Sequence, residues 1–455
     1  MPESPRRFVI SCGVMAVAAA VIAPAGAANA APPAVFWVSA GGSAAHANAS
    51  CQTAGYNSVQ SAVNAAESYE SSHPGAVPAV EVCPGTYSEQ VTIDKSLALS
   101  RAPVPVSQGA AVIQLPSSVG SDQSKGLSTT ACQANDAAKG VQAPQSVIEI
   151  CGATTGVKVA VSDLTVEGNW PGSVCYDSLY GILVGGGASL TLTGSTVEKA
   201  GAVSPLSGCQ GGIGVQAGNQ TTGQVGHVDL SRDTIETYQK NGIAIKGAGS
   251  TGGIDHTVVT GAGPTSAIAQ NGIEYLDGAT GKVTDSSVSG NNYTGTGNAS
   301  SGGILVFGGC GSSLVRDAHF TKNTLTGNDV GIYLFNGDPA CTKSPTTRTD
   351  IEACFNVIEN SHGYPGGHPS ADANRDGWST SPAVGFQAGI SDVGNHDEIC
   401  GNAISGAGYA PLGATSSLPH PPAPAFVRPV DIVTGPAIDP LTFGNTFDGR
   451  PYHPA

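Results

Sequence analysis

The dipeptide Gly-Ile recurs in this chain at an almost constant interval. It occurs at Gly181-Ile182, Gly212-Ile213, Gly242-Ile243, Gly272-Ile273, Gly303-Ile304 and Gly331-Ile332. The isoleucines are 31, 30, 30, 31 and 28 residues apart, and a second apolar or aromatic side chain follows each of them two positions later. A fixed period with an alternation of two residues inside each unit is typical of stacked strands, with one coil of a solenoid per repeat.

A second phrase accompanies the first and consists of an Asn, Asp or Ser, a spacer and an apolar residue. It reads Ser195-Thr196-Val197, Asp233-Thr234-Ile235, His256-Thr257-Val258 (preceded by Asp255), Asn323-Thr324-Leu325, Asn402-Ala403-Ile404 and Asn445-Thr446-Phe447. The repeats are rich in Gly, Thr and Val and poor in Leu, Glu and Lys, which disfavours paired helices. Two strands and a tight polar turn per coil therefore predict an all-β fold, a single parallel β-helix.

The composition limits the partners of such a chain. Charged residues make up 12% of the 455 residues, against about a quarter in an average protein. The formal net charge of −15 argues against nucleic acid and anionic membrane surfaces as partners. An anionic polysaccharide would need a local basic group or a bridging cation. The oligomeric state is left open.

Residues 1–30 have the pattern of a secretory signal peptide. Arg6 and Arg7 form its basic start, residues 8–23 its apolar run, and Ala28-Asn29-Ala30 its small-residue cleavage site. No later stretch of the sequence is long and apolar enough to span a bilayer. We therefore expect a mature protein that is secreted and soluble.

Ten cysteines remain after Cys12 is assigned to the signal peptide. An even number in an exported protein, with no C-x-x-C pair, predicts disulfides rather than metal thiolates. Neighbouring cysteines in the sequence would lie on the same or adjacent coils, so we expect sequential pairs. These are Cys51–Cys83, Cys132–Cys151, Cys175–Cys209, Cys310–Cys341 and Cys354–Cys400.

The order of elements after the signal peptide carries a family resemblance. A first strand is expected at Phe36-Trp37-Val38, and Ser58 can cap a helix that runs to about Glu67. A strand at residues 80–82, a turn at Cys83-Pro84-Gly85-Thr86-Tyr87 and a strand at residues 90–93 follow. This order resembles the start of pectin-lyase-like right-handed parallel β-helix proteins. The resemblance implies a right-handed coil whose N-terminal end is covered by the helix.

The expected organisation has four parts. Residues 1–30 are the signal peptide, residues 31–145 an N-terminal cap with the first coils, and residues 146–417 the β-helix proper. Residues 418–455 form a Pro-rich segment with one last coil or a covering flap. We expect the insertions at residues 344–350 and 362–382 to project as loops.

An outward face is predicted from the Gly-Ile phrase. If each isoleucine points into the core, the residues one and three positions later point outward. The resulting face carries Gln216, Lys246, Glu274, Phe307, Tyr333 and Phe335. Exposed aromatic rings beside polar groups suit the stacking and hydrogen bonding of sugar rings. The alternative is a cross-strand ion pair between Lys246 and Glu274, with loops covering the aromatic side chains.

Two asparagines precede glycines of the Gly-Ile phrase and should stack. Asn241 and Asn271 are 30 residues apart. They resemble the internal asparagine ladder of β-helix proteins, whose amides satisfy turn backbone groups. We expect a structural role for this pair.

The segment Asp372-Ala373-Asn374-Arg375-Asp376-Gly377 has the spacing of the first half of a calcium loop. Asp372, Asn374 and Asp376 would supply three side-chain oxygens. The twelfth position, where a closing acid belongs, is Ala383. Either a residue elsewhere, such as Asp392, completes a calcium site, or the segment is a polar turn.

The catalytic motifs give no single answer. Gly253-Ile254-Asp255-His256 resembles a short pectate lyase motif in which an aspartate serves calcium, but its Trp is missing, and the motifs of pectin methylesterases and polygalacturonases are absent. For a hydrolase, the candidate carboxylate pairs join Glu274 to Asp255 or to Asp277.

We predict recognition of an extracellular polysaccharide along the outer face. If the protein cleaves it, a lyase fits best, with Lys246 or Lys240 as base, Glu274 nearby and calcium neutralising a uronate. The alternative is a non-catalytic carbohydrate-binding or adhesin-like solenoid.

Overall fold

The computed structural model describes residues 34–117, 132, 145–152, 156–169, 179–201, 206–294, 299, 301–341, 344–361, 388–406, 409, 432–434 and 440–451. The expected signal peptide, the insertion at residues 362–382 and the Pro-rich stretch at residues 418–424 lie outside the described residues.

Three long sheets make up the fold. Sheet A contains β1 (Val35–Val38), β2 (Ala79–Val82), β5 (Leu97–Arg101), β8 (Lys158–Ser162), β11 (Ala188–Thr193), β14 (Gly226–Ser231), β17 (Thr251–Asp255), β20 (Thr280–Thr284), β23 (His319–Thr321), β26 (Glu352–Cys354), β29 (Glu398–Cys400) and β32 (Leu441–Phe443). Sheet B contains β3 (Gly85–Ser88), β6 (Ala111–Gln114), β9 (Thr165–Glu167), β12 (Thr196–Glu198), β15 (Thr234–Glu236), β18 (Val258–Thr265), β21 (Ser287–Tyr293), β24 (Thr324–Thr326), β27 (Val357–Glu359), β30 (Ala403–Ser405), β33 (Thr446–Phe447) and β34 (Arg450–Pro451). Sheet C contains β4 (Val91–Ile93), β7 (Gln145–Cys151), β10 (Leu179–Gly185), β13 (Ile213–Ala217), β16 (Asn241–Lys246), β19 (Asn271–Leu276), β22 (Gly302–Gly308), β25 (Val330–Asn336), β28 (Ala388–Asp392) and β31 (Ile432–Thr434).

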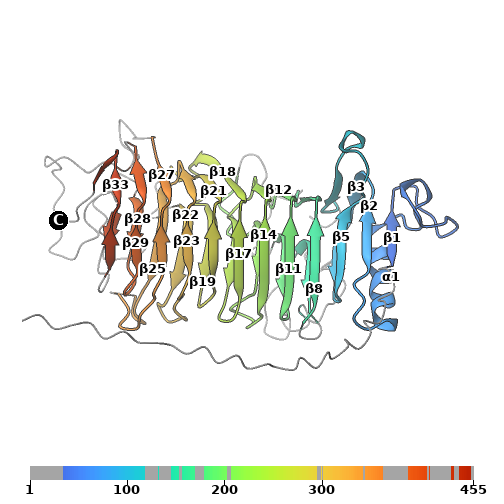
Figure 1. The fold of residues 1–455 in the computed structure, drawn as a ribbon, viewed down its shortest axis with the longest axis horizontal. Helices are drawn as coiled ribbons and strands as arrows, with labels where there is room; N and C mark the ends of the chain where they lie inside the picture. The colour runs from blue at the N-terminus through green and yellow to red at the C-terminus, as the bar shows by residue number, and fades with distance from the viewer. Residues whose placement is uncertain are drawn as a thin grey trace, which may run out of the picture. The chain divides into compact units, whose positions relative to one another are not determined.

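From β2 to β33 the chain visits sheets A, B and C in turn, so each complete coil adds one strand to every sheet. Neighbouring strands are parallel throughout, apart from β34, which pairs antiparallel with β33. Figure 1 shows the strands of successive coils side by side, from the blue N-terminal end to the red C-terminal end. The fold is therefore the expected right-handed parallel β-helix, with the hand that connections between parallel strands usually take. One continuous core of Val, Ile and Leu runs inside the coils.

The helix α1 (Val59–Ser72) begins where the sequence predicts and ends five residues later than expected. Ser58 caps it by accepting a hydrogen bond from the Ser61 backbone N–H (3.1 Å). The Glu89 carboxylate adds a second cap, because its oxygens accept from the first backbone N–H groups of the helix at 2.7 and 2.9 Å. The buried face of α1 packs against β1, β2, β4 and β5 at the N-terminal end of the core. The turn expected at residues 83–87 is wrong in part, since β3 begins at Gly85 and opens sheet B.

A column of glycines fixes the register of sheet C. A Cβ atom on each of these glycines except the last would lie 2.5 to 2.7 Å from the carbonyl oxygen of the next glycine in the column. The column consists of Gly181, Gly214, Gly242, Gly272, Gly303, Gly331 and Gly389. The prediction that Gly212-Ile213 belongs to it is wrong, because Ile182 pairs with Val215 and Val215 pairs with Ile243. Gly214 takes the place of Gly212 at the close backbone approach.

The ladder inside the coils lies at the turn from sheet A to sheet B. Its rungs are Ser195, Asp233, Thr257, Ser286, Asn323, Asn356, Asn402 and Asn445. From Thr257 onward, each rung's backbone N–H donates to the side-chain oxygen of the next rung at 2.9 to 3.1 Å. At Thr257 the predicted phrase is shifted by one residue, since Val259 rather than Val258 is buried.

Asn241 and Asn271 also stack, but they belong to a different position. Asn271 Nδ2 donates to Asn241 Oδ1 (3.3 Å), and Asn241 Nδ2 donates to Glu274 Oε2 (2.5 Å). Glu274 belongs to the outward column of sheet C described below. The internal ladder predicted from Asn241 and Asn271 is therefore wrong in position, while their side-chain hydrogen bond agrees with a structural role.

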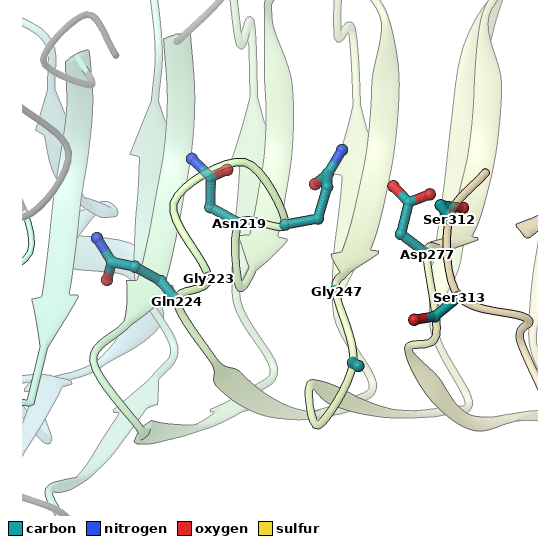
Figure 2. A pocket seen from close by; sticks show the side chains of 9 residues that line it. Asn219, Gly223, Gln224, Gly247, Asp277, Ser312 and Ser313 are labelled. Carbon is teal, nitrogen blue, oxygen red and sulfur yellow. The ribbon is translucent and has the colours of Figure 1, made fainter. Parts of the chain in front are cut away.

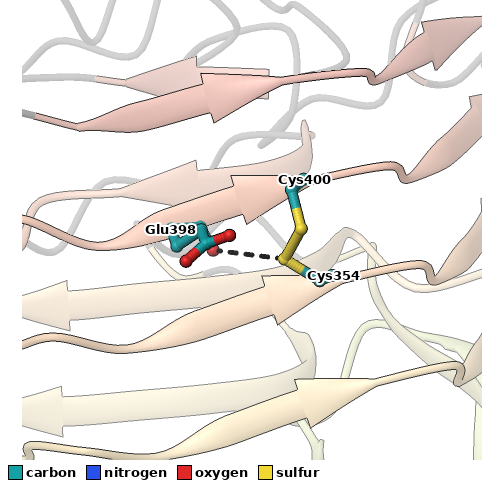
Figure 3. Close-up of side chains that lie close together, drawn as sticks. All are labelled: Cys354, Glu398 and Cys400. Carbon is teal, nitrogen blue, oxygen red and sulfur yellow. Dashed lines mark hydrogen bonds between the residues drawn. A yellow bond between two sulfur atoms is a disulfide. The ribbon is translucent and has the colours of Figure 1, made fainter. Parts of the chain in front are cut away.

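Four of the five expected disulfides are present among the described residues. They join Cys51 to Cys83, Cys132 to Cys151, Cys310 to Cys341 and Cys354 to Cys400. Cys209 is also disulfide-bonded, and its expected partner Cys175 lies outside the described residues. Figure 3 shows Cys354 and Cys400 bonded across adjacent strands of sheet A, where the two residues are paired in register.

The last coil consists of β31, β32 and β33, which is the first of the two alternatives, a coil or a flap, expected within residues 418–455. Among the described residues, no helix is long and apolar enough to cross a membrane.

Candidate functional site

Two outward columns run along sheet C. One contains Leu183, Gln216, Ala244, Glu274, Leu305 and Tyr333. The other contains Lys246, Leu276, Phe307 and Phe335. Gln216 was expected on the same outward face as Lys246. Because of the register shift at Gly214 it pairs with Ala244 in the first column, two residues along the strand from the column of Lys246.

The aromatic end of this face is built by β22 and β25. The Phe307 ring stacks on the Phe335 ring with centroids 5.3 Å apart and an interplanar angle of 13°. Tyr333 meets Phe335 edge to face at 5.7 Å, and burial raises the pKa of Tyr333. Phe307 is 38% exposed, whereas Phe335 is 4% exposed. The solvent-facing ring of this cluster is therefore Phe307, supported from one side by Phe335.

Gln216 lies away from this cluster and is 2% exposed. Its Nε2 donates to the Gly218 carbonyl oxygen at 3.0 Å, and its buried Oε1 has no hydrogen-bond partner among the residues that the structure describes.

Lys240, Lys246 and Glu274 are near one another at the middle of sheet C. Burial lowers the pKa of Lys240, Glu274 opposes this shift, and the charge of Lys246 adds to it. Lys240 Nζ donates to the Ala269 carbonyl oxygen at 2.6 Å. Glu274 is 7% exposed and accepts the hydrogen bond from Asn241. No ion pair joins Lys246 to Glu274 in the described coils.

The insertion at residues 344–350 forms hydrogen bonds with the turn at residues 393–397. Thr349 Oγ1 donates to Asp397 Oδ1 (2.6 Å), and Asn395 Nδ2 donates to the Pro345 carbonyl oxygen (2.9 Å). This insertion therefore packs on the turn at residues 393–397, several coils further along.

A polar pocket opens where strands of sheet C end and the chain turns toward sheet A. Its volume is about 370 Å³, within the usual range of small-molecule sites, about 300 to 1,000 Å³. It is lined by Asn219, Gln220, Gly223, Gln224, Gly247, Ala248, Asp277, Ser312 and Ser313. Figure 2 shows Asn219 on one loop, with Asp277, Ser312 and Ser313 on neighbouring coils. We refer to it as the amide pocket.

The amide pocket borders the second outward column. Gly247 and Asp277 directly follow Lys246 and Leu276, and the Asp277 backbone N–H donates to the Phe307 carbonyl oxygen at 3.0 Å. The aromatic face and the pocket are thus neighbouring parts of one surface.

Of the two carboxylate pairs considered for a hydrolase, Glu274 with Asp255 and Glu274 with Asp277, the fold places the first on different sheets. Asp255 ends β17 in sheet A, whereas Glu274 lies in sheet C. Asp277 lies at the turn after Glu274, in the amide pocket.

Candidate metal ligands fall into three groups. Asp372, Asn374 and Asp376 lie outside the described residues. Asp392, considered as their partner, is fully buried, and burial together with Asp397 raises its pKa well above the ordinary value.

A second group consists of Asp255, His256 and Asp285, whose ligand atoms lie within 4.8 Å of one another. The hydrogen bond from His256 Nδ1 to Asp255 Oδ2 (2.8 Å) lowers the pKa of Asp255. Cys354, Glu398 and Cys400 also lie close together. The disulfide in Figure 3 leaves these two cysteines without thiolates for a metal.

Sequence reasoning missed the amide pocket. Its lining comes from turns that are separated by up to about a hundred residues, and these turns do not share a motif. Asp277 has φ 53° at the turn position that Gly247 occupies, with φ 90°, in the preceding coil. A non-glycine residue at such a position is uncommon.

No family model and no curated protein matches this sequence. Among solved structures, pectate lyase Pel9A is 14% identical, covers 72% of this chain and 77% of its own, and has a TM-score of 0.42. A rhamnogalacturonan lyase is 11% identical, covers 72% of this chain and 74% of its own, and has a TM-score of 0.36. A pectin methylesterase from Aspergillus niger is 13% identical, covers 88% of this chain and 92% of its own, and has a TM-score of 0.31. At these identities and TM-scores the comparisons assign no activity, and the parallel β-helix rests on the three sheets of this chain itself.

Proposed function

We propose that this protein is secreted and recognises an extracellular polysaccharide along the outer face of sheet C. The observation that carries the proposal is the exposed Phe307 ring, stacked on Phe335 and bordered by the amide pocket. An aromatic ring held in place from behind offers a flat apolar surface for the C–H face of a sugar. The pocket beside it offers hydrogen-bonding groups for hydroxyls.

Export is supported by the disulfides. Four complete bridges among the described residues fit an oxidising compartment. The sequence pattern of residues 1–30 supports the same location.

The test is a titration of the purified protein with a panel of soluble polysaccharides by isothermal titration calorimetry. Phe307→Ala should weaken binding about ten-fold, since a tenfold change corresponds to about 1.4 kcal/mol and aromatic contacts of this kind contribute on that order. Phe443→Ala is the matched control, because Phe443 is 58% exposed and lies on sheet A. Equal affinities for wild type and Phe307→Ala would refute the assignment of this face.

Cleavage is a second candidate, favoured by Lys240. A lysine whose pKa is lowered loses its proton more readily, and its neutral amine can accept a proton from a sugar carbon. In a lyase, Lys240 or Lys246 would serve as base and a calcium ion would neutralise the uronate carboxylate. Calcium bound by Asp372, Asn374 and Asp376 is part of this proposal.

The lyase proposal is tested in the same panel by absorbance near 235 nm, with and without calcium. A calcium-dependent rise that disappears in Lys240→Ala would support it. New reducing ends without absorbance would point to a hydrolase and to Glu274. Binding without either signal would leave a non-catalytic carbohydrate-binding solenoid.

A further inference from the structure

We infer that the amide pocket binds a neutral sugar residue of the polysaccharide, one that carries hydroxyl groups and no carboxylate. This inference rests on the proposed function, because the pocket is treated as a subsite for the same polymer. It goes beyond that function by naming the chemical class of the bound sugar.

The first argument is the supply of free hydrogen-bonding groups in the pocket. In the described residues, no protein atom pairs with the Gln220 amide, Asn219 Nδ2, the Asp277 carboxylate or the Ser313 hydroxyl. By contrast, both ends of the Gln224 amide are used, because Oε1 accepts from the Gly186 N–H and Nε2 donates to the Cys132 carbonyl oxygen, each at 3.0 Å. Gln224 is therefore part of the wall, and the other four groups are available to a ligand.

The second argument is the kind of groups that are free. Amides supply both donors and acceptors, a hydroxyl can do either, and a carboxylate only accepts. A sugar hydroxyl donates one hydrogen bond and accepts others, so it can satisfy all of these groups. Two adjacent hydroxyls can donate together to the two oxygens of Asp277.

The third argument is charge. The lining contains one carboxylate, Asp277, and no Lys, Arg or His. A uronate carboxylate in the pocket would face a like charge with no cation of the lining to offset it. The pocket therefore disfavours an acidic sugar, although Lys246 is adjacent in sequence on the outward column.

The fourth argument is the rigidity of the pocket. Asp277 has a left-handed backbone conformation, φ 53°, which a residue other than glycine keeps only where the surrounding structure holds it. Here its backbone N–H donates to the Phe307 carbonyl oxygen at 3.0 Å. The loop that carries Ser312 and Ser313 is held at its base by the Cys310–Cys341 disulfide. The Ser312 hydroxyl donates to the Gly309 carbonyl oxygen at 2.7 Å. A pre-formed polar wall lowers the entropy lost when a sugar binds.

The test compares wild type with Asp277→Asn and Gln220→Ala, using soluble galactan, mannan and xylan as neutral probes and polygalacturonate as the acidic probe. Asparagine tolerates the left-handed conformation, so Asp277→Asn removes the charge while keeping the turn. Asp163→Asn is the matched control, because Asp163 is exposed, has φ 55° and lies on a turn between sheets A and B. Thermal melts of all variants check that the fold is kept.

We expect a neutral polymer to bind at least about ten-fold more tightly than polygalacturonate. Asp277→Asn and Gln220→Ala should each weaken binding of the neutral polymer about five-fold to ten-fold. Gln220→Ala removes a hydrogen bond, and Asp277→Asn removes the charge that strengthens one. Asp277→Asn should also narrow the difference between neutral and acidic polymers.

The outcomes separate the two proposals. If Phe307→Ala weakens binding while Asp277→Asn and Gln220→Ala do not, the pocket inference is overturned and polysaccharide recognition stands. If polygalacturonate binds more tightly than every neutral polymer, the inference that the pocket takes a neutral sugar is overturned. If no polymer of the panel binds, the proposed function fails, and the pocket inference fails with it.

Discussion

Replacement of Asn356 by alanine should remove one complete rung of the internal ladder. Asn356 is fully buried. Its Oδ1 accepts hydrogen bonds from the backbone N–H and the Nδ2 of Asn323, at 2.9 and 3.1 Å. Its Nδ2 donates to the Phe320 carbonyl oxygen and to Asn402 Oδ1, both at 2.9 Å. The substitution therefore breaks four buried hydrogen bonds at once.

The size of the effect follows from this count. At roughly 1 kcal/mol per bond, four bonds amount to about 4 kcal/mol of unfolding free energy. Ser286 provides an internal scale, because its Oγ makes two bonds, accepting from the Thr257 N–H (3.1 Å) and donating to the Thr284 carbonyl oxygen (2.8 Å). Ser286→Ala should therefore cost about 2 kcal/mol, half as much.

The assay is equilibrium unfolding in urea followed by circular dichroism, with the m-value compared between variants to verify that the same surface is exposed. Asn64→Ala is the control, since Asn64 is exposed on α1 and makes one side-chain contact with Gln60. If Ser286→Ala destabilises as much as Asn356→Ala, the bond count is not what sets the stability of the ladder. A loss below about 1 kcal/mol for Asn356→Ala would also refute the reasoning.

Two further predictions concern packing and pH. Gly272→Ala should lower the unfolding free energy by about 1–3 kcal/mol, since its Cβ would lie 2.3 Å from Val288 Cγ1 and 2.6 Å from a backbone oxygen. The control is Gly41→Ala, whose Cβ would meet nothing within 4 Å and which should leave the thermal melt almost unchanged. Burial raises the pKa of Glu67 to about 7 from 4.5. Between these two pH values the folded state holds a proton that the unfolded chain has released. The stability contributed by Glu67 therefore falls as pH rises from about 4.5 to about 7. Glu67→Gln should flatten the dependence of the melting temperature on pH in this window, and an unchanged slope would contradict the assignment.

The period of the Gly-Ile phrase was enough to predict the stacked strands, because a strand buried on one face must repeat its apolar positions in every coil. It did not predict the register at residues 212–215. There Gly212-Ile213 and Gly214-Val215 both satisfy the same pattern. The backbone approach decides between them, since a Cβ on Gly214 would lie 2.5 Å from the Gly242 carbonyl oxygen. Sequence alone contains no information on that distance.

The ladder illustrates a different limit. The sequence contains both the turn phrase with Asn323, Asn402 and Asn445 and the pair Asn241 and Asn271, and of the two sets only the pair has the spacing of about 30 residues seen in the Gly-Ile phrase. Which amides lie inside the coil depends on where the chain bends from sheet A to sheet B. The residue before each rung has a positive φ there, but it is glycine only at Gly194, Gly401 and Gly444. The amide pocket was beyond prediction because its walls are turns from separate coils, whose positions depend on the whole stack.

The antiparallel strand β34 has a consequence for the behaviour of the protein at high concentration. An open β-helix ends in strands whose free N–H and C=O groups can pair with another molecule. At the C-terminal end, β34 folds back on β33 and occupies its hydrogen-bonding edge, and Pro451 contributes no N–H of its own. At the other end, α1 covers the first coils. The strand β34 thus hinders end-to-end association of separate molecules into fibres at β33. A chain that stops after Phe447 would expose that edge to a second molecule.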